Sequence, residues 1–112
     1  MAGRGFWIFQ MDVSDAGAYA AYQQAAGPVL AKYNARFMVR GGRSELIEGG
    51  GPRRAVILAF PDYDTALACW HSPEYAAAKA HRVGCAMGTV SIVEEYDGPQ
   101  HERAEAAIPP GA

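Results

Sequence analysis

His71 is the side chain of this sequence best suited to proton transfer. An imidazole changes charge near neutral pH, so it can serve as the acid or base that an isomerase or cyclase needs. His71 stands four residues before Tyr75, and on a helix that spacing places two side chains on one face. We therefore predict that His71 is catalytic and shares a cavity with Tyr75. The structural alternative is a histidine that caps a helix or bonds to the sheet.

Arg40 and Arg82 are the candidates for holding negative charge. Arg82 follows Tyr75 by seven residues, on nearly the same helical face, and Arg40 directly precedes two glycines. A guanidinium beside a pocket can bind a carboxylate, phenolate or enolate through two parallel hydrogen bonds, so we predict both as substrate-binding residues. The alternative is an internal ion pair, because partly buried arginines are usually paired. The available carboxylates are Glu74, Glu94 and Asp97.

Aromatic side chains are frequent enough to build the wall of a pocket for a flat molecule. Most of them must belong to the core, since aromatics at strand and helix spacing usually do. We single out Tyr22 and Tyr75 as pocket walls, because a buried hydroxyl needs a partner, and add Trp70 as a further substrate contact. The complete set is Trp7, Phe9, Tyr19, Tyr22, Phe60, Tyr63, Trp70 and Tyr75.

The sequence predicts neither a metal nor a cofactor. His81 and Cys85 have the i, i+4 spacing of two metal ligands, but a structural zinc site needs four. No phosphate-binding loop, dinucleotide fingerprint or Ser-His-Asp order is present. The only cysteines are Cys69 and Cys85, which we expect to be free thiols.

Composition restricts the class of partner. The 112 residues are half hydrophobic and carry a net charge of −2, which argues against nucleic acid or an anionic membrane surface. No apolar run approaches the roughly 20 residues that span a bilayer. The first residues lead into a strand rather than a signal peptide, so we expect a cytoplasmic protein.

The elements that must position these side chains follow from hydrophobic spacing and turn residues. Strands are predicted over 6–13, over 36–40 with a bend at Gly41 and Gly42 and a continuation over 44–48, over 54–60 and over 90–96. A helical segment over 14–33 should kink or break at Pro28. A second one starts at Pro61 and restarts at Ser72, which can cap the piece beginning at Pro73 and ending near Gly84.

Strand, helix, strand, strand, helix, strand is the order of a ferredoxin-like βαββαβ domain. This α+β fold has a four-stranded antiparallel sheet with both helices on one face. Both faces of the first strand begin with apolar residues, and a bare apolar sheet face is rare on a monomer. We therefore predict a homodimer, with one domain over 1–98 and a surface tail over 99–112.

The chain resembles the domain of unknown function 1330 family over roughly residues 5–99. The resemblance lies in 40–42 (Arg-Gly-Gly), in 66–75 with its closing Ser-Pro-Glu-Tyr, in Arg82 and in 93–98. It implies a dimeric α/β barrel, in which two ferredoxin-like subunits pack sheet against sheet. The wider superfamily includes cofactor-independent monooxygenases, isomerases and cyclases, although the family itself implies a fold more than a chemistry.

Three hypotheses follow. The first is a small cofactor-independent enzyme for an aromatic or polyketide-like compound. His71 would act as acid or base, Arg40 and Arg82 would hold negative charge, and Tyr22 and Tyr75 would orient the ligand. The second is a non-catalytic module that binds a small ligand or only assembles. The third is a haem-binding or oxygen-using member of the wider superfamily.

Overall fold

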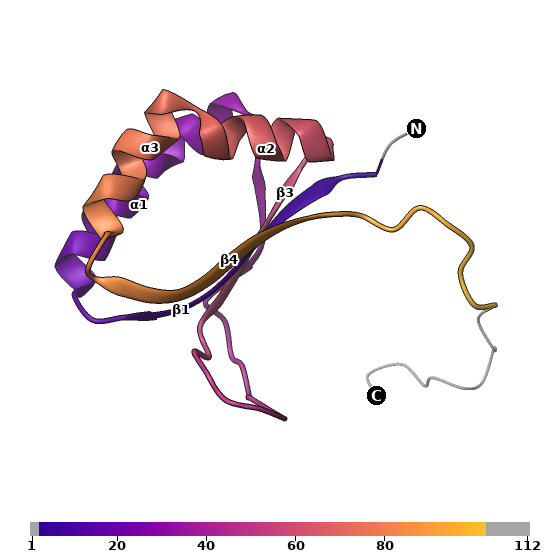
Figure 1. Cartoon of the computed structure of the whole chain (residues 1–112), viewed down its shortest axis with the longest axis horizontal. Helices are drawn as coiled ribbons and strands as arrows, with labels where there is room; N and C mark the ends of the chain where they lie inside the picture. The colour runs from indigo at the N-terminus through magenta and orange to yellow at the C-terminus, as the bar shows by residue number, and fades with distance from the viewer. Residues whose placement is uncertain (1–2, 103–112) are drawn as a thin grey trace.

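The computed structural model describes residues 3–102, which form four strands, three α-helices and one short 3₁₀-helix (Figure 1). In chain order these are β1 (Gly5–Val13), α1 (Ala16–Lys32), β2 (Arg36–Arg40), β3 (Ala55–Phe60), α2 (Tyr63–His71), α3 (Pro73–Lys79), η1 (Ala80–Arg82) and β4 (Ala86–Glu94).

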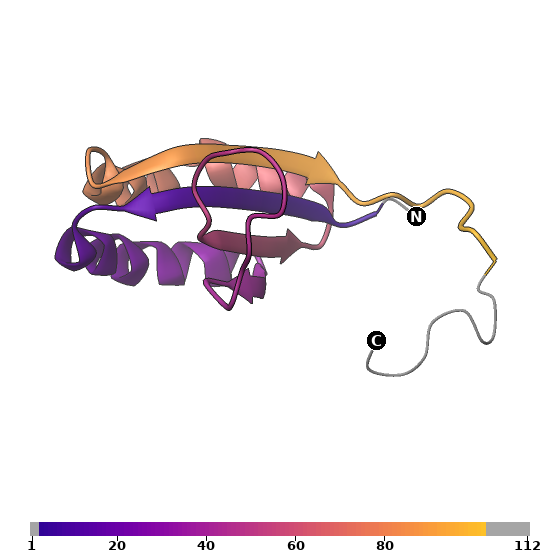
Figure 2. The same ribbon diagram turned by 90° about the horizontal axis from the view of Figure 1, so that it is seen from below.

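The four strands form one antiparallel sheet in the order β2-β3-β1-β4. All the helices lie on one side of it (Figure 1), and Figure 2 looks onto the opposite, uncovered side. The two central strands are β1 and β3, each of which begins one βαβ-like half of the chain. The predicted ferredoxin-like βαββαβ fold with helices on one face is confirmed.

Local capping signals set the helix boundaries. Asp15 accepts a hydrogen bond from the backbone N–H of Ala18, and Asp62 accepts one from Thr65, so each caps the helix that follows it. Ser72 ends α2 in an extended conformation, and its hydroxyl caps α3. Pro73 occupies the first position of α3, where its missing N–H removes no helical bond.

The core lies between the sheet and the helices. Alternation along β1 turns Trp7, Phe9 and Met11 toward the helices, and all three are buried. Strand pairing sets Leu58 beside Trp7 and Val56 beside Phe9, so the same layer continues across β3. Burying this apolar layer is the main source of stability for a domain of this size.

The uncovered face of the sheet also carries apolar side chains. Phe6, Ile8 and Ile57 are only half-buried there, and Ile8 is paired with Ile57 at the centre of the sheet. Val39 and Val93 extend the surface toward the two edges and are 38% and 40% exposed. Both faces of β1 thus carry apolar side chains, as the sequence indicates, and within a single chain the helices cover only one of them.

Helix α1 differs from its predicted form, because it is one continuous helix with Pro28 inside it. Pro28 lies one turn before the helix ends and on its exposed side. The carbonyl that loses its hydrogen bond, four residues earlier at Gln24, belongs to an exposed residue that water can reach. The expected separate second piece is absent for this reason.

The predicted continuation of the second strand over 44–48 is wrong. β2 ends at Arg40, Gly41 turns away with φ of 63°, and residues 41–54 form an irregular loop. This loop projects on the side of the sheet away from the helices (Figure 1), so no neighbouring strand pairs with it. Ile47 is accordingly 83% exposed. The last strand also differs, since β4 starts at Ala86 and ends at Glu94.

Three further predictions concern the thiols, membrane-spanning helices and the C-terminal end of the domain. Cys69 and Cys85 are both free and buried, as expected. No helix within the described residues is both long and apolar enough to cross a membrane. The domain boundary at 98 and the tail over 99–112 stay predictions, because 103–112 lie outside the described residues.

Candidate functional site

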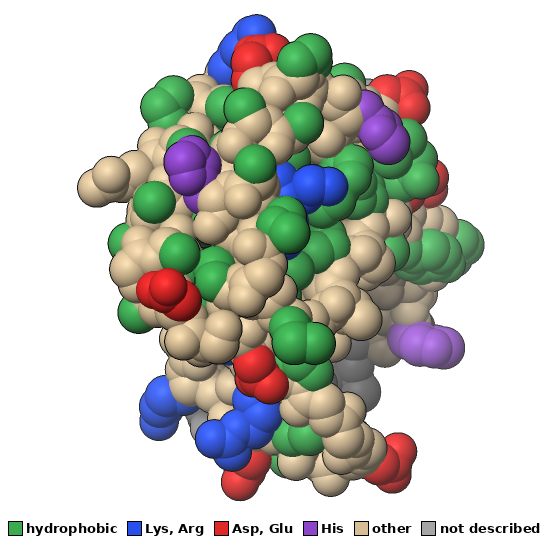
Figure 3. Space-filling model, turned by 60° about the vertical axis from the view of Figure 1, so that its left-hand side comes forward, with side chains coloured by type: hydrophobic (Ala, Val, Ile, Leu, Met, Phe, Trp, Pro, Cys, Tyr) green, Lys and Arg blue, Asp and Glu red, His purple; other side chains and the backbone are tan. Residues whose placement is uncertain are grey.

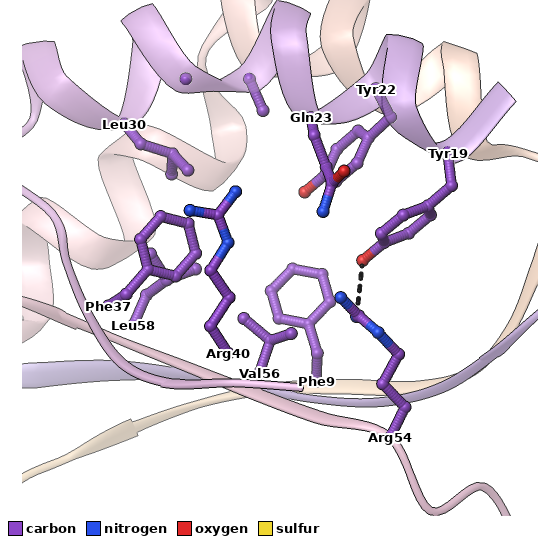
Figure 4. A pocket seen from close by; sticks show the side chains of 12 residues that line it. Phe9, Tyr19, Tyr22, Gln23, Leu30, Phe37, Arg40, Arg54, Val56 and Leu58 are labelled. Carbon is purple, nitrogen blue, oxygen red and sulfur yellow. Dashed lines mark hydrogen bonds between the residues drawn. The ribbon is translucent and has the colours of Figure 1, made fainter. Parts of the chain in front are cut away.

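A pocket opens between α1 and the half of the sheet that contains β2 and β3 (Figure 4). Its volume is about 140 Å³. It exists because Ala26 and Gly27, on the side of α1 that faces the sheet, have no side chain long enough to fill the space. The lining residues are Phe9, Tyr19, Tyr22, Gln23, Ala26, Gly27, Leu30, Phe37, Arg40, Arg54, Val56 and Leu58.

Two arginines reach into this otherwise largely apolar pocket. Arg40, the last residue of β2, lies with its guanidinium 4.1 Å from the centre of the Phe37 ring. Arg54, just before β3, lies 5.1 Å from the Tyr19 ring and donates a hydrogen bond of 3.2 Å to the Tyr19 hydroxyl. Among the described residues neither arginine forms a salt bridge, and no Asp or Glu lines the pocket.

A buried hydrogen-bonded chain runs from the wall of the pocket into the core. The hydroxyl oxygens of Tyr22 and Tyr75 are 2.7 Å apart, and Arg82 Nη2 donates to the Tyr75 oxygen over 3.4 Å. Burial raises the pKa of both tyrosines, so both hydroxyls stay neutral at physiological pH. The sequence predicted Tyr22, Tyr75 and Arg82 as binding residues, and the structure brings these three together.

Arg82 holds its charge in the core without a carboxylate partner in the described part of the chain. It is 6% exposed, and its Nε has no hydrogen-bond partner. Its guanidinium is surrounded instead by the rings of Phe9, Tyr22 and Trp70, at 5.5, 5.1 and 5.9 Å. The alternative role, an internal ion pair with Glu74, Glu94 or Asp97, is therefore not found among the described residues. Of the predicted partners, Glu74 pairs with Lys32.

Trp70 and the pocket lie on opposite sides of the hydrogen-bonded chain formed by Tyr22, Tyr75 and Arg82. Its ring packs against Trp7 and Tyr75, with centroids 5.4 and 5.2 Å apart. It lines a shallower hollow near the start of β4 together with Lys79 and Arg82. Figure 3 shows this end of the molecule, where a basic side chain lies in a hollow between hydrophobic ones. Trp70 is therefore placed beside the hydrogen-bonded chain and outside the pocket under α1.

His71 is not where the sequence argument placed it. It is exposed at the last position of α2, whereas Tyr75 is fully buried. The expectation of a shared cavity fails because Ser72 interrupts the helix between them, so helical spacing does not continue from His71 to Tyr75. A catalytic role for His71 stays a prediction, now for a surface side chain outside the pocket.

Arg54 and Gln23 both line the pocket but were not among the predicted site residues. A signal for Arg54 was available. It lies two residues before Val56, so strand alternation puts the two side chains on the same face of the sheet. Gln23 follows Tyr22 on α1. Whether it lines a pocket depends on how the helix packs on the sheet, which the sequence does not reveal.

The arrangement suits recognition of a small anion with an apolar body. The aromatic and aliphatic walls favour a flat ring, and the two arginines supply charged donors that match a carboxylate or phenolate. Within the described residues no group of three or more His, Cys, Asp or Glu side chains could hold a metal ion. The Cys85 thiol faces the carbonyl oxygen of His81 at 3.9 Å.

Solved structures resemble this chain in fold. A protein of unknown function from Rhodopseudomonas palustris is 19% identical, with a TM-score of 0.66 over 86% of this chain and 85% of that one. A dimeric ferredoxin-like protein of unknown function from Thermobifida fusca is 17% identical, with a TM-score of 0.50 over 85% and 90%. A dimeric ferredoxin-like protein of unknown function from Bacteroides fragilis is 11% identical, with a TM-score of 0.52 over 84% and 96%.

A comparison with curated proteins finds no match. A family model described as a domain of unknown function, DUF1330, matches residues 4–96, which include every element of the sheet and all the helices that cover it. The resemblance inferred from the sequence is thereby confirmed, and the chain belongs to the DUF1330 family.

Proposed function

We propose that this protein binds a small aromatic anion in the pocket under α1. The observation that carries the proposal is a pair of arginines, Arg40 and Arg54, without carboxylate partners among the described residues, at a pocket with largely apolar walls. A guanidinium attracts an anion more strongly where apolar walls partly exclude water, as they do beside these two arginines. The ligand should therefore place its acidic group between the two guanidinium groups.

The volume of the pocket limits the apolar part of the ligand. An apolar cavity of about 150 Å³ is large enough to hold benzene. At about 140 Å³ this pocket accepts one ring, with its acidic substituent at the open side. The ring would contact Phe9, Val56 and Leu58 on the sheet. A single-ring compound fits this volume better than the fused rings of a polyketide.

Equilibrium binding of a matched pair of probes tests the proposal. We expect para-isopropylbenzoate to bind more tightly than para-isopropylbenzyl alcohol, which has the same ring but no charge. Loss of one charge-assisted hydrogen bond costs about 1.5–3 kcal/mol, so Arg40→Gln and Arg54→Gln should each weaken the carboxylate about tenfold or more. Neither change should affect the alcohol.

Arg36→Gln is the matched control, because Arg36 lies on the same strand as Arg40 but pairs with Ala59, on the opposite face of the sheet. It should leave the affinity for both probes unchanged. Equal affinity for the acid and the alcohol, or no binding of either at millimolar concentration, contradicts the proposal.

We infer that two chains associate through the uncovered sheet face. Its centre is the apolar pair Ile8 and Ile57, and the loop with the exposed Ile47 projects on the same side (Figure 1). Solved proteins of similar fold are described as dimeric.

Sedimentation of the wild-type protein tests this inference and should give twice the 12.0 kDa of one chain. Ile57→Glu should yield monomers, whereas Val83→Glu, at an exposed site outside this face, should not; a wild-type monomer contradicts the inference.

Catalysis in the same pocket is the second candidate, as an isomerase, cyclase or monooxygenase that needs no cofactor. The observation that favours it is the chain of Tyr22, Tyr75 and Arg82 beside the pocket, because buried donors can stabilise negative charge that develops in a reaction. The predicted role of His71 is tested by turnover of a His71→Ala variant once a substrate is known.

The free thiols of Cys69 and Cys85 agree with a cytoplasmic location, which we retain as a proposal.

A further inference from the structure

The direction of the hydrogen bonds between Arg82, Tyr75 and Tyr22 can be worked out from which groups can donate. Arginine only donates, so the Tyr75 oxygen accepts from Arg82. Each tyrosine hydroxyl has a single proton, and the two oxygens share one of these protons across 2.7 Å. One of the two protons is therefore left without a partner among the described residues.

The two possible arrangements differ in cost. If Tyr22 donates to Tyr75, the Tyr75 proton is left over in a fully buried position, where an unpaired donor costs about 1–3 kcal/mol. If Tyr75 donates to Tyr22, the Tyr22 proton is left over instead. Tyr22 lines the pocket, and Figure 4 shows its hydroxyl pointing toward the middle of it, where a ligand can accept. The second arrangement is therefore favoured.

The hydrogen-bonded chain from Arg82 through Tyr75 to Tyr22 begins at a positive charge. Arg82 is buried and has no carboxylate to neutralise it in the described residues, so its field acts on Tyr75 and, through Tyr75, on Tyr22. Hydrogen bonds in series polarise one another inside a protein. The Tyr22 hydroxyl should thus be a stronger donor than an isolated tyrosine, and its proton is directed into the pocket.

We propose that Tyr22 donates this hydrogen bond to a second oxygen of the ligand, at the end of the ring away from its acidic group, and that Tyr75 and Arg82 are positioning residues that strengthen it. The proposal rests on the proposed function, since it requires the aromatic anion to occupy the pocket. Arg40 is exposed and Arg54 is partly so, whereas Tyr22 is 6% exposed. The ligand class is accordingly a ring with a carboxylate toward the open side and a keto or phenolic oxygen toward the buried side.

Two probes of nearly equal shape test this directly. Para-acetylbenzoate has a ketone oxygen where para-isopropylbenzoate has a methyl group. The wild-type protein should bind the ketone at least about fivefold more tightly, as expected for one hydrogen bond of about 1 kcal/mol. Tyr22→Phe should abolish the preference, so that the two probes bind this variant with equal affinity. Tyr75→Phe and Arg82→Met should each reduce the preference only in part.

The infrared spectrum of the bound ketone provides a readout that a change in folding would not imitate. The C=O stretch should lie at lower frequency in the wild-type complex than in the Tyr22→Phe complex, with Tyr75→Phe and Arg82→Met between the two. Tyr19→Phe is the matched control. It removes another hydroxyl from the same pocket, but one that holds Arg54, so it should weaken both probes alike and leave the stretch unchanged.

The outcomes separate the two proposals. If neither probe binds, the proposed function and this inference both fail. If both probes bind with equal affinity, or if Tyr22→Phe changes neither the preference nor the C=O stretch, the inference fails and the pocket remains. If Tyr22→Phe has the expected effect but Tyr75→Phe and Arg82→Met behave like the wild type, the role of the two positioning residues is overturned.

Discussion

Replacing Arg82 by methionine should leave the stability of the fold almost unchanged. The substitution removes a buried charge and keeps a chain of similar length among the rings of Phe9, Tyr22 and Trp70. This prediction is informative because a buried arginine is normally taken to stabilise the fold. Here the contacts indicate that the fold gains little from it.

The expected change in the free energy of unfolding follows from the contacts that Arg82 makes and from the one that it lacks. Its Nε has no partner within residues 3–102, and a buried unpaired donor costs about 1–3 kcal/mol, which the substitution recovers. Against this stand one long hydrogen bond to Tyr75, worth about 0.5–1.5 kcal/mol, and three cation–π contacts. The methionine sulfur replaces part of these contacts by packing against the same rings, so their net loss is about 0.5–2 kcal/mol. These contributions nearly cancel, so the free energy of unfolding should change by less than about 1 kcal/mol.

Urea unfolding followed by circular dichroism measures this change. The chain concentration must be held constant, because an associating protein has a concentration-dependent midpoint. Leu58→Ala serves as the control, since truncating this buried side chain should cost about 2–5 kcal/mol. A loss of about 3–5 kcal/mol for Arg82→Met, the size expected when one member of a buried ion pair is removed, would refute the reasoning.

Three further predictions concern the sheet, the chain ends and a thiol. Gly88→Ala should lower the free energy of unfolding by more than about 3 kcal/mol, because the added carbon would lie 1.9 Å from a β1 carbonyl oxygen at φ of 153°, whereas Gly27→Ala meets open space and should not destabilise. The hydrogen bonds from Arg4 lower the pKa of Glu95 to about 2, so this carboxylate adds stability above pH 4.5 that is lost as the pH falls toward 2. In Arg4→Gln an NMR titration should show this pKa raised toward the usual 4.5 but still below it, because the backbone N–H of residue 4 remains a donor, and an unchanged value contradicts the assignment. Burial raises the pKa of the Cys69 thiol to about 12, so maleimide at pH 8 should label it only after unfolding, which peptide mass spectrometry can check.

The parts of the fold that could be predicted from the sequence are those with local signals. Ser72 and Pro73 identify a helix start because capping depends on neighbouring atoms alone. Residues 44–48 misled the prediction because alternation describes a strand but not whether another strand lies beside it. Pro28 misled it because the cost of a proline depends on whether water reaches the carbonyl it leaves unpaired.

The same distinction applies to the candidate site. Tyr75 and Arg82 share one continuous helical stretch, so their spacing correctly predicted that they meet. His71 and Tyr75 do not, because Ser72 separates their helices. The contact between Tyr22 and Tyr75 joins α1 to α3, and only the packing of the two helices on the sheet creates it. The pocket itself depends on space left by Ala26 and Gly27, which spacing in the sequence does not reveal.

The most direct test of the central claim is an NMR titration of the ¹⁵N-labelled protein with para-isopropylbenzoate. Binding in the pocket under α1 predicts saturable shifts of the backbone amides of Gln23 and Gly27 on the helix and of Val56 on β3. The amide of Ile8, whose side chain lies on the uncovered side of the same sheet, should move far less. Saturable shifts confined to that uncovered face, or no saturable shifts at all, would contradict the account.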